Sequence, residues 1–297
     1  MKTLYLECNM GAAGDMLMGA LLELLSPKEK EEFLEELNHA GIPHLKVTAE
    51  PSVKCGITGT HMRVSIHGEE EESLDIEKEV EAFHSYEQEK ERERGEHAHT
   101  QAHIHSHEPH AHGDSPFHSH VHHTHHHAGM KDIAEQIEAL NLNPAVKADI
   151  RNIYHIIAQA EGQVHGCEIK DIHFHEVGTA DALADITGCA MLFHKLGATQ
   201  VLVSPVTTGF GQVRCAHGIL PVPAPATARI LEGIPCSAGR IEGELCTPTG
   251  AAILRYYASA YGRMQEMKME KIGYGMGKKD FPAANCVRAV FGDAPAV

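Results

Sequence analysis

The sequence predicts an α/β protein, a mixed sheet with flanking helices, interrupted by a disordered His-rich insertion. Strand-like and helix-like segments alternate along most of the chain, which is typical of α/β architectures. Hydrophobic residues make up 42% of the 297 residues, enough to bury a substantial core. Between His97 and Gly129, by contrast, fourteen residues are histidines, and such a composition does not build a core.

The pattern divides the chain into three parts. Residues 1–84 form an N-terminal α/β part, 85–129 a charged and then His-rich flexible insertion, and 130–297 an α/β core. The first part opens with a strand, because residues 3–8 alternate in polarity. The elements that follow there are a helix from Asp15, a helix near 28–40, and strands near 47–50 and 58–68.

In the third part, order returns near Met130. Asn143-Pro144 predicts a helix start, since Asn caps helices and Pro suits their first position. The apolar stripe of that helix consists of Val146, Ile150, Ile153, Ile157 and Val164. Further elements are a strand over 171–177, a helix over 181–197, a strand over 201–206, a proline-containing loop over 209–227 leading into a helix to about 232, a helix over 247–262 and a closing strand over 285–292.

Composition excludes several classes of function. No apolar run is long enough to span a bilayer, and Glu7 interrupts the short apolar start, which is therefore no secretory signal. We expect a cytoplasmic protein without a membrane partner. The net charge of −16 and the lack of a Lys/Arg cluster argue against nucleic acid and favour metal cations. The eight scattered cysteines, with no CxxC pair, predict reduced thiols.

The His-rich stretch predicts metal binding. Neutral imidazole suits nickel, zinc and copper, but a flexible segment lacks the fixed geometry that catalysis needs. Storage or delivery of metal is therefore the favoured interpretation, and adventitious binding by a low-complexity segment is the alternative. The predicted reservoir consists of His97, His99, His103, His105, His107, His110, His112, His118, His120, His122, His123, His125, His126 and His127.

A second candidate is the segment HFHEVGTADALAD, residues 173–185. In a strand, His173 and His175 point to one face and can approach one metal ion. Asp181 and Asp185 are four residues apart, so a helix places both carboxylates on one face. Alternatively, backbone groups satisfy the histidines, and Asp181 only caps its helix.

Three other segments carry polar groups in loops. GAAGD, with Gly11, Gly14 and Asp15, lies between a strand and a helix, where it either binds an anion or is a plain tight turn. The loop 209–227 offers Arg214 for a phosphate and the Cys215–His217 pair for a metal, unless it is only a surface crossover. In ELCTPTGAA, Thr247 and Thr249 either hold an anion or cap the next helix.

Taken together, five segments closely resemble the LarC-type nickel insertion proteins: MKTLYLECNMGAAGDM, HFHEVGTADALADITG, GFGQVRCAHGILPVPAPAT, EGELCTPTGAAIL and KIGYGMGKKDFPAANCVRAVFG. Such proteins insert Ni(II) into pyridinium-3,5-bisthiocarboxylic acid mononucleotide, forming the nickel-pincer nucleotide cofactor of lactate racemase. The resemblance covers nearly all of the chain outside 69–129. This sequence has Glu7 and Asn9-Met10 where family members commonly carry Asp and Phe-Ser.

The resemblance implies a metal chelatase of the lyase class that uses CTP and a divalent cation. Family members bind CTP through a C-terminal domain that lies beyond this chain, and some are encoded in two pieces. The implied partners are the mononucleotide substrate, a separately encoded nucleotide-binding domain, and the lactate racemase apoprotein as acceptor. A non-catalytic nickel storage or delivery chaperone is the alternative function.

Candidate site residues follow from the motifs together with that resemblance. The catalytic candidates are His173, His175, Glu176 and His217. The candidate nickel ligands are His173, His175, Asp181, Asp185, Cys215 and His217. The candidates for the substrate phosphate are Gly11, Gly14, Asp15 and Arg214. Because formation of a nickel–carbon bond removes a ring proton, His217 or Glu176 is the expected base.

Overall fold

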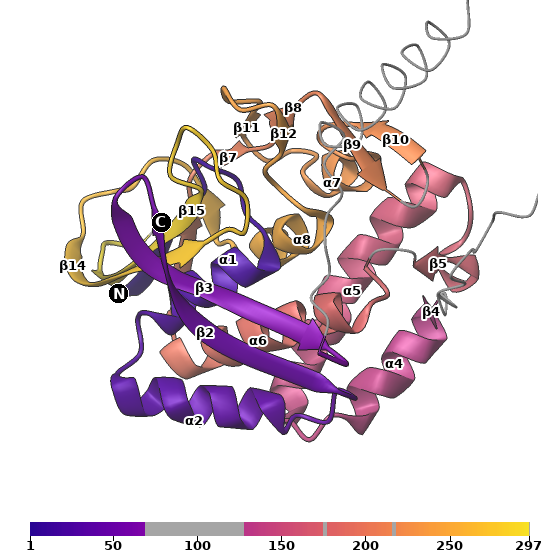
Figure 1. The fold of residues 1–297 in the computed structure, drawn as a ribbon, viewed down its shortest axis with the longest axis horizontal. Helices are drawn as coiled ribbons and strands as arrows, with labels where there is room; N and C mark the ends of the chain where they lie inside the picture. The colour runs from indigo at the N-terminus through magenta and orange to yellow at the C-terminus, as the bar shows by residue number, and fades with distance from the viewer. Residues whose placement is uncertain (69–127, 175–176, 216–217, 297) are drawn as a thin grey trace, which may run out of the picture. The chain divides into compact units, whose positions relative to one another are not determined.

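The computed structural model describes residues 1–68, 128–174, 177–215 and 218–296, all within one compact unit. A seven-stranded sheet runs through this unit in the order β13-β6-β1-β15-β14-β3-β2 (Figure 1). Its strands are β1 (Lys2–Glu7), β2 (Leu45–Lys54), β3 (Ile57–Ile66), β6 (Gln200–Val203), β13 (Ala260–Tyr261), β14 (Lys268–Met276) and β15 (Cys286–Asp293). β1 pairs in parallel with β6 and antiparallel with β15, so the sheet is mixed, as predicted.

Seven α-helices accompany the sheet in the described segments. They are α1 (Gly14–Leu22), α2 (Pro27–Asn38), α4 (Met130–Ala139), α5 (Pro144–His165), α6 (Ala180–Leu196), α7 (Pro225–Ile230) and α8 (Pro248–Tyr257). Their starts follow local chemistry. Ser26 and Glu29 form a capping box at α2, and the Asn143 side chain accepts a hydrogen bond from the Ala145 amide at α5.

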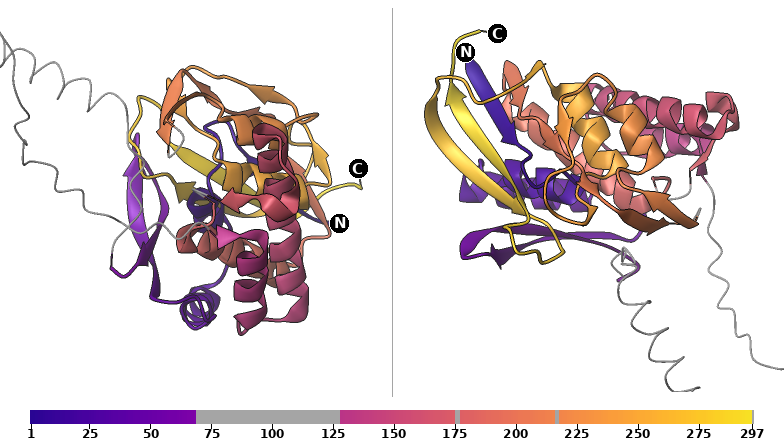
Figure 2. Two further views of the ribbon diagram at one scale, coloured as in Figure 1. Left: turned by 90° about the vertical axis from the view of Figure 1, so that its right-hand side faces the viewer. Right: turned by 90° about the horizontal axis from the view of Figure 1, so that it is seen from above.

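The helices cover one face of the sheet (Figure 2). The alternation of β1 explains this arrangement, because Leu4 and Leu6 enter the main core shared with the helices. Tyr5, on the opposite face, belongs to a small second cluster with Leu202 and Val290, against which Ala260 and Met267 pack. The main driving force for folding therefore acts on the helical side of the sheet.

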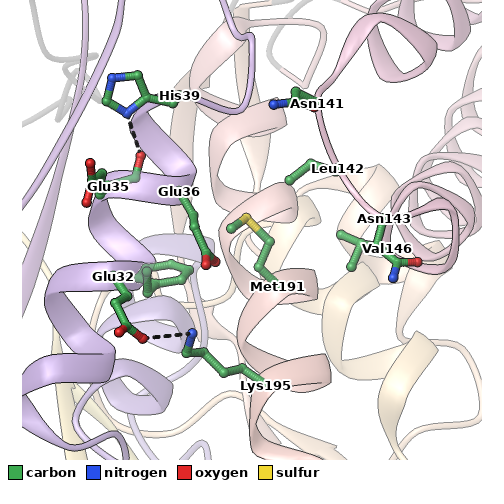
Figure 3. A pocket seen from close by; sticks show the side chains of 11 residues that line it. Glu32, Glu35, Glu36, His39, Asn141, Leu142, Asn143, Val146, Met191 and Lys195 are labelled. Atoms are coloured by element: carbon green, nitrogen blue, oxygen red, sulfur yellow. Dashed lines mark hydrogen bonds and ion pairs between the residues drawn. The ribbon is translucent and has the colours of Figure 1, made fainter.

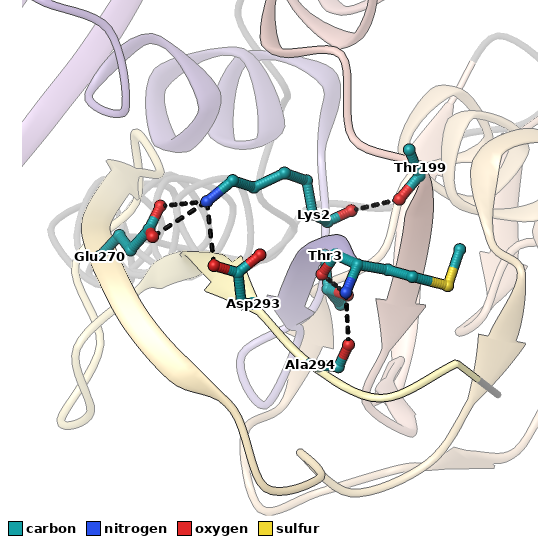
Figure 4. Close-up of polar contacts among 7 residues, drawn as sticks. Lys2, Thr3, Thr199, Glu270, Asp293 and Ala294 are labelled. Atoms are coloured by element: carbon teal, nitrogen blue, oxygen red, sulfur yellow. Dashed lines mark hydrogen bonds and ion pairs between the residues drawn. The ribbon is translucent and has the colours of Figure 1, made fainter.

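At one end of the sheet, polar contacts hold the start of β1 (Figure 4). The Lys2 ammonium pairs with the Glu270 carboxylate at 2.8 Å and with Asp293 at 3.1 Å. Both contacts raise the pKa of Lys2. The Lys2 carbonyl accepts hydrogen bonds from the Thr199 amide and hydroxyl, each at 2.9 Å. These contacts link β1 to β14, to β15 and to the segment before β6.

Several elements differ from the sequence prediction. Within 209–227 the chain forms β8 (Gly209–Phe210), which pairs with residues 243–244, and the hairpin of β9 (Gln212–Cys215) and β10 (Gly218–Pro221). Val164 is 37% exposed, so the buried stripe of α5 does not extend to it. The sequence prediction also omitted β14. Further short elements are β4 (Ala128–Gly129), a 3₁₀ turn (Ile169–Asp171), β5 (His173–Phe174), β7 (Val206–Thr207), β11 (Cys236–Ser237) and β12 (Gly243–Glu244).

Strands on both sides of the insertion share the one sheet, since β1, β2 and β3 precede the insertion and β6, β13, β14 and β15 follow it. The predicted flexible insertion lies almost entirely outside the described residues. No helix in the described segments is long and apolar enough to cross a membrane.

Helix α1 lies directly on β14, and Gly275 makes this close approach possible. A Cβ at Gly275 would lie 1.8 Å from the Met16 carbonyl oxygen and 2.5 Å from the Ala20 amide nitrogen. Both are helix backbone atoms, which cannot move aside singly. Gly275→Ala should therefore lower the free energy of unfolding by about 1–3 kcal/mol or more, measured by urea denaturation.

Gly262→Ala is the matched control, because a Cβ there meets no atom within 4 Å. It should leave the denaturation midpoint nearly unchanged. Equal stability of the two variants would contradict the close packing of α1 on β14.

Candidate functional site

The candidate site is built around the turn between β1 and α1, at the carboxyl ends of the parallel strands β1 and β6. This edge is where open α/β sheets commonly bind ligands. Gly11 takes a φ of 84° and its amide donates to the Cys8 carbonyl at 3.1 Å. The Ala12 amide donates to the Leu245 carbonyl at 3.0 Å, and the Thr247 amide donates to the Ala12 carbonyl at 3.1 Å. The GAAGD and ELCTPTGAA segments thus meet through their backbones.

Glycines allow these backbones to approach. A Cβ at Gly11 would lie 1.8 Å from the Leu245 carbonyl oxygen, and one at Gly250 would lie 2.2 Å from the Ala12 carbonyl oxygen. The Thr247 hydroxyl accepts a hydrogen bond from the Gly250 amide at 3.2 Å. Thr247 is therefore the cap of α8, one of the two roles that its sequence allowed.

Helix α6 approaches the same turn from another side. A Cβ at Gly14 would lie 2.4 Å from Asp185 Oδ2, and the Cys189 thiol lies 3.5 Å from the Gly14 carbonyl oxygen. Thr179 caps α6 by accepting from the Ala182 amide at 3.4 Å, so the alternative in which Asp181 is the cap is wrong. Asp181 and Asp185 lie one turn apart in α6, as the spacing predicted.

The N-termini of α1 and α8 therefore meet at residues 12–14, and α6 passes beside them with Asp185 and Cys189. The dipoles of these two helix starts favour negative charge, and the chain itself supplies carboxylates nearby. Asp15 lies in the first turn of α1, where its Oδ1 accepts from the Met16 amide at 2.7 Å. Asp185 borders Gly14. Helix ends that hold several carboxylates in place can present them together to a cation.

Buried Tyr154 of α5 lies near the Asp185 carboxylate. Burial raises the pKa of its hydroxyl, and the charge of Asp185 raises that pKa further. Its ring makes an edge-on contact with Phe174 of β5, with centroids 6.0 Å apart. Tyr154 thus lies between Phe174 of β5 and the Asp185 carboxylate of α6. In the sequence it reads as one more residue of a core helix, so no signal marked it.

Of the other site residues that the sequence predicted, three have described positions and the rest fall outside the described residues. His173 is exposed in β5, opposite Gly129. Arg214 is exposed and Cys215 half-buried at the end of β9. Within the described ranges, no three His, Cys, Asp or Glu side chains are grouped so that they could hold a metal. His175, Glu176, His217 and the fourteen reservoir histidines lie outside the described residues.

Comparison with known proteins agrees with the resemblance in the motifs. A sequence model described as "Nickel insertion protein" matches residues 4–296. The chain belongs to this family. No solved structure matches it.

Relatives in this family carry an explicit activity in their names. A pyridinium-3,5-bisthiocarboxylic acid mononucleotide nickel insertion protein from Geobacillus kaustophilus is 35% identical over 99% of this chain and 60% of its own length. Proteins of the same name from Clostridium acetobutylicum and Clostridium kluyveri are 39% and 36% identical, with 64% and 62% of their lengths covered. This chain thus spans about three-fifths of the length of these relatives.

Two hollows lie in the described surface of this family member. The larger, of about 630 Å³, lies between α2, α6 and the α4–α5 connection (Figure 3). Glu32, Glu36, His39 and Lys195 contribute to its lining, but no residue of the motifs at the α1 turn does. The smaller, of about 490 Å³, borders the turn itself through Asn9, and Leu245 forms part of its wall. The position of the motifs therefore favours the smaller hollow as the candidate ligand site, although it has the smaller volume.

Buried thiols beneath the site should be unreactive. Burial raises the pKa of Cys8 to about 12, and burial also raises the pKa of Cys189 and of Cys246. Because the thiolate is the reactive form, these three should resist a disulfide reagent at pH 8. Exposed Cys55 and Cys167 should react at once in a timed titration followed by peptide mass analysis.

Unfolding in urea provides the control for this experiment, since it should release all three thiols. Rapid labelling of Cys8 or Cys246 in the folded chain would show that the α1 turn is open, contrary to the packing described here.

Proposed function

We propose that this protein takes part in inserting nickel into pyridinium-3,5-bisthiocarboxylic acid mononucleotide, forming the nickel-pincer nucleotide cofactor of lactate racemase. The observation that carries the proposal is family membership over residues 4–296, with relatives named for this reaction. In class the activity is a metal chelatase, a lyase. Both nickel and the mononucleotide are its substrates.

The carboxylates at the α1 turn support a nickel site of oxygen and nitrogen ligands. Asp185 is held beside Gly14, and Asp181 lies one helical turn away. Nickel bound by such ligands can pass to softer sulfur ligands of the substrate, provided that the site leaves coordination positions open. The proposed ligands are His173, His175, Asp181, Asp185, Cys215 and His217, with Glu176 beside them.

The reaction breaks one ring C–H bond and forms one nickel–carbon bond and two nickel–sulfur bonds. The electron pair of the C–H bond goes to the nickel–carbon bond, and the proton must go to a base. We assign this proton to His217 or Glu176, which accompany the proposed ligands in sequence. The proposed catalytic group is thus His173, His175, Glu176 and His217.

Further proposals concern the rest of the system. CTP and a divalent cation take part in the reaction through a C-terminal nucleotide-binding domain, which is a partner where it is separately encoded. The lactate racemase apoprotein receives the product, and the reaction takes place in the cytoplasm. The phosphate of the substrate contacts Arg214 and the turn that contains Gly11, Gly14 and Asp15.

One prediction separates metal supply from chemistry. Deleting 97–127 should remove most bound nickel, because fourteen histidines are lost, yet leave much of the insertion activity at ample free Ni(II). The variants His173→Ala and His175→Ala should retain the reservoir nickel and lose activity that excess Ni(II) does not restore. Calorimetric nickel binding and an assay of cofactor formation, with the C-terminal domain supplied, measure both properties.

The His173→Ala/His175→Ala double variant is the internal control. Ligands of one site act as a unit, so each single loss should nearly equal the double loss. Rescue by excess nickel would instead assign these histidines to the reservoir. Nickel binding by the unaltered chain without any product would favour a storage chaperone.

A separate prediction concerns the substrate phosphate. Arg214→Ala should weaken mononucleotide binding by about 1.5–3 kcal/mol, the usual contribution of a hydrogen bond to a charged group. Binding of the corresponding nucleoside, which lacks the phosphate, should not change. An unaltered affinity of Arg214→Ala for the mononucleotide, measured by calorimetry, would reject this assignment.

A further inference from the structure

The smaller hollow has the composition of a binding site for a small phosphorylated ligand, because it combines apolar walls, polar groups and one cation. Its walls come from the β1–α1 turn, from the segment 239–245 and from the loop 277–285. Met10, Ile241 and Leu245 make it largely apolar, and Asn9 and Thr207 add polar groups. Its volume of about 490 Å³ falls within the range of small-ligand sites.

Arg240 supplies the only cation of this lining. Nearly every other arginine in the described segments is engaged, for example Arg288 with Glu7 and Arg255 with backbone carbonyls. Neither Arg240 nor Arg263 has an ion pair or hydrogen bond within the described part of the chain. An unengaged guanidinium at the rim of an apolar hollow is suited to a phosphate, which it can bind through two parallel hydrogen bonds.

The far wall is held in place before any ligand binds. Lys54, which is nearly buried, donates to the Lys278 carbonyl at 3.1 Å and pairs with Asp280 at 2.7 Å. The Asn285 side chain donates to the Lys279 carbonyl at 3.0 Å. Both contacts fix the loop that contributes Ala283 and Ala284 to the hollow. A preformed wall lowers the ordering cost of binding.

We infer that this hollow binds the ribose-phosphate end of the mononucleotide substrate and that Arg240 contacts its phosphate. The inference rests on the proposed function. The hollow borders Asn9 and Met10, and the same turn continues to Gly14, which lies beside Asp185 of α6. The ring of the substrate therefore lies toward the α6 carboxylates. Arg214, on β9, contacts the same phosphate. Strand β9 packs on β12, and β12 immediately precedes Leu245 of the hollow.

The test is calorimetric titration of the full chain with pyridinium-3,5-bisthiocarboxylic acid mononucleotide and with its nucleoside. Arg240→Ala should weaken mononucleotide binding about 10- to 100-fold, the effect of losing one hydrogen-bonded charge, and leave nucleoside binding unchanged. Arg263→Ala is the matched control, since it removes another exposed, unengaged arginine outside the hollow, and it should bind as the unaltered chain does.

Ala283→Phe tests the hollow independently of charge. The larger side chain should weaken binding of both the mononucleotide and the nucleoside by occupying the site, while the melting temperature confirms folding. If Arg240→Ala binds the mononucleotide as tightly as Arg263→Ala does, the hollow is not the phosphate site, although the proposed function stands. If the unaltered chain with the C-terminal domain binds no mononucleotide, the proposed function itself fails.

Discussion

The backbone contact between the β1–α1 turn and the segment before α8 is the constraint on which the candidate site depends. Ala12 donates to Leu245 and accepts from Thr247, so two segments more than two hundred residues apart in sequence are joined by adjacent hydrogen bonds. Such a contact requires two backbones without side chains between them, and Gly11 and Gly250 meet that requirement. It fixes the start of α1 relative to the start of α8.

Once α1 is fixed, α6 completes an electrostatic arrangement. The N-termini of α1 and α8 meet at residues 12–14, and α6 brings Asp185 beside Gly14. Asp15, in the first turn of α1, interacts favourably with the positive end of that helix, and Asp185 packs against Gly14. The same carboxylates are then held where a cation can share them. Structure and proposed chemistry therefore use the same side chains, and substitutions of Asp185 will affect both.

Local signals in the sequence predicted most of the helices and the strands around the core. Asn143-Pro144 marked the start of α5, and the spacing of Asp181 and Asp185 placed both on one helical face. Short strands within 209–227 were not predictable in this way, because a hairpin such as β9–β10 depends on pairing, which sequence polarity alone does not reveal. Strand β14 was missed because charged and glycine residues interrupt its apolar pattern.

The site was predictable only in its parts. Each motif could be named from its residues, but the meeting of Gly14 with Asp185 is a contact between distant segments, and nothing in either segment specifies it. Tyr154 and Arg240 had no motif around them and became candidates only through their neighbours in space. Chemistry is thus visible in short segments, whereas the positions of those segments depend on the whole core.

The position of β1 in the sheet also has a consequence for biosynthesis. Strand β1 pairs with β6 and β15, which end at Val203 and Asp293. Its apolar residues therefore lack one strand partner until Val203 has been translated and the other until Asp293 has been translated, which exposes them to aggregation and to chaperones. A longer insertion lengthens this delay during translation. The entropic cost of bringing the strands on its two sides together, however, grows only with the logarithm of the insertion length. The fold can thus accept large changes in the length of this segment at little cost in stability, so the number of its histidines can vary independently of the core.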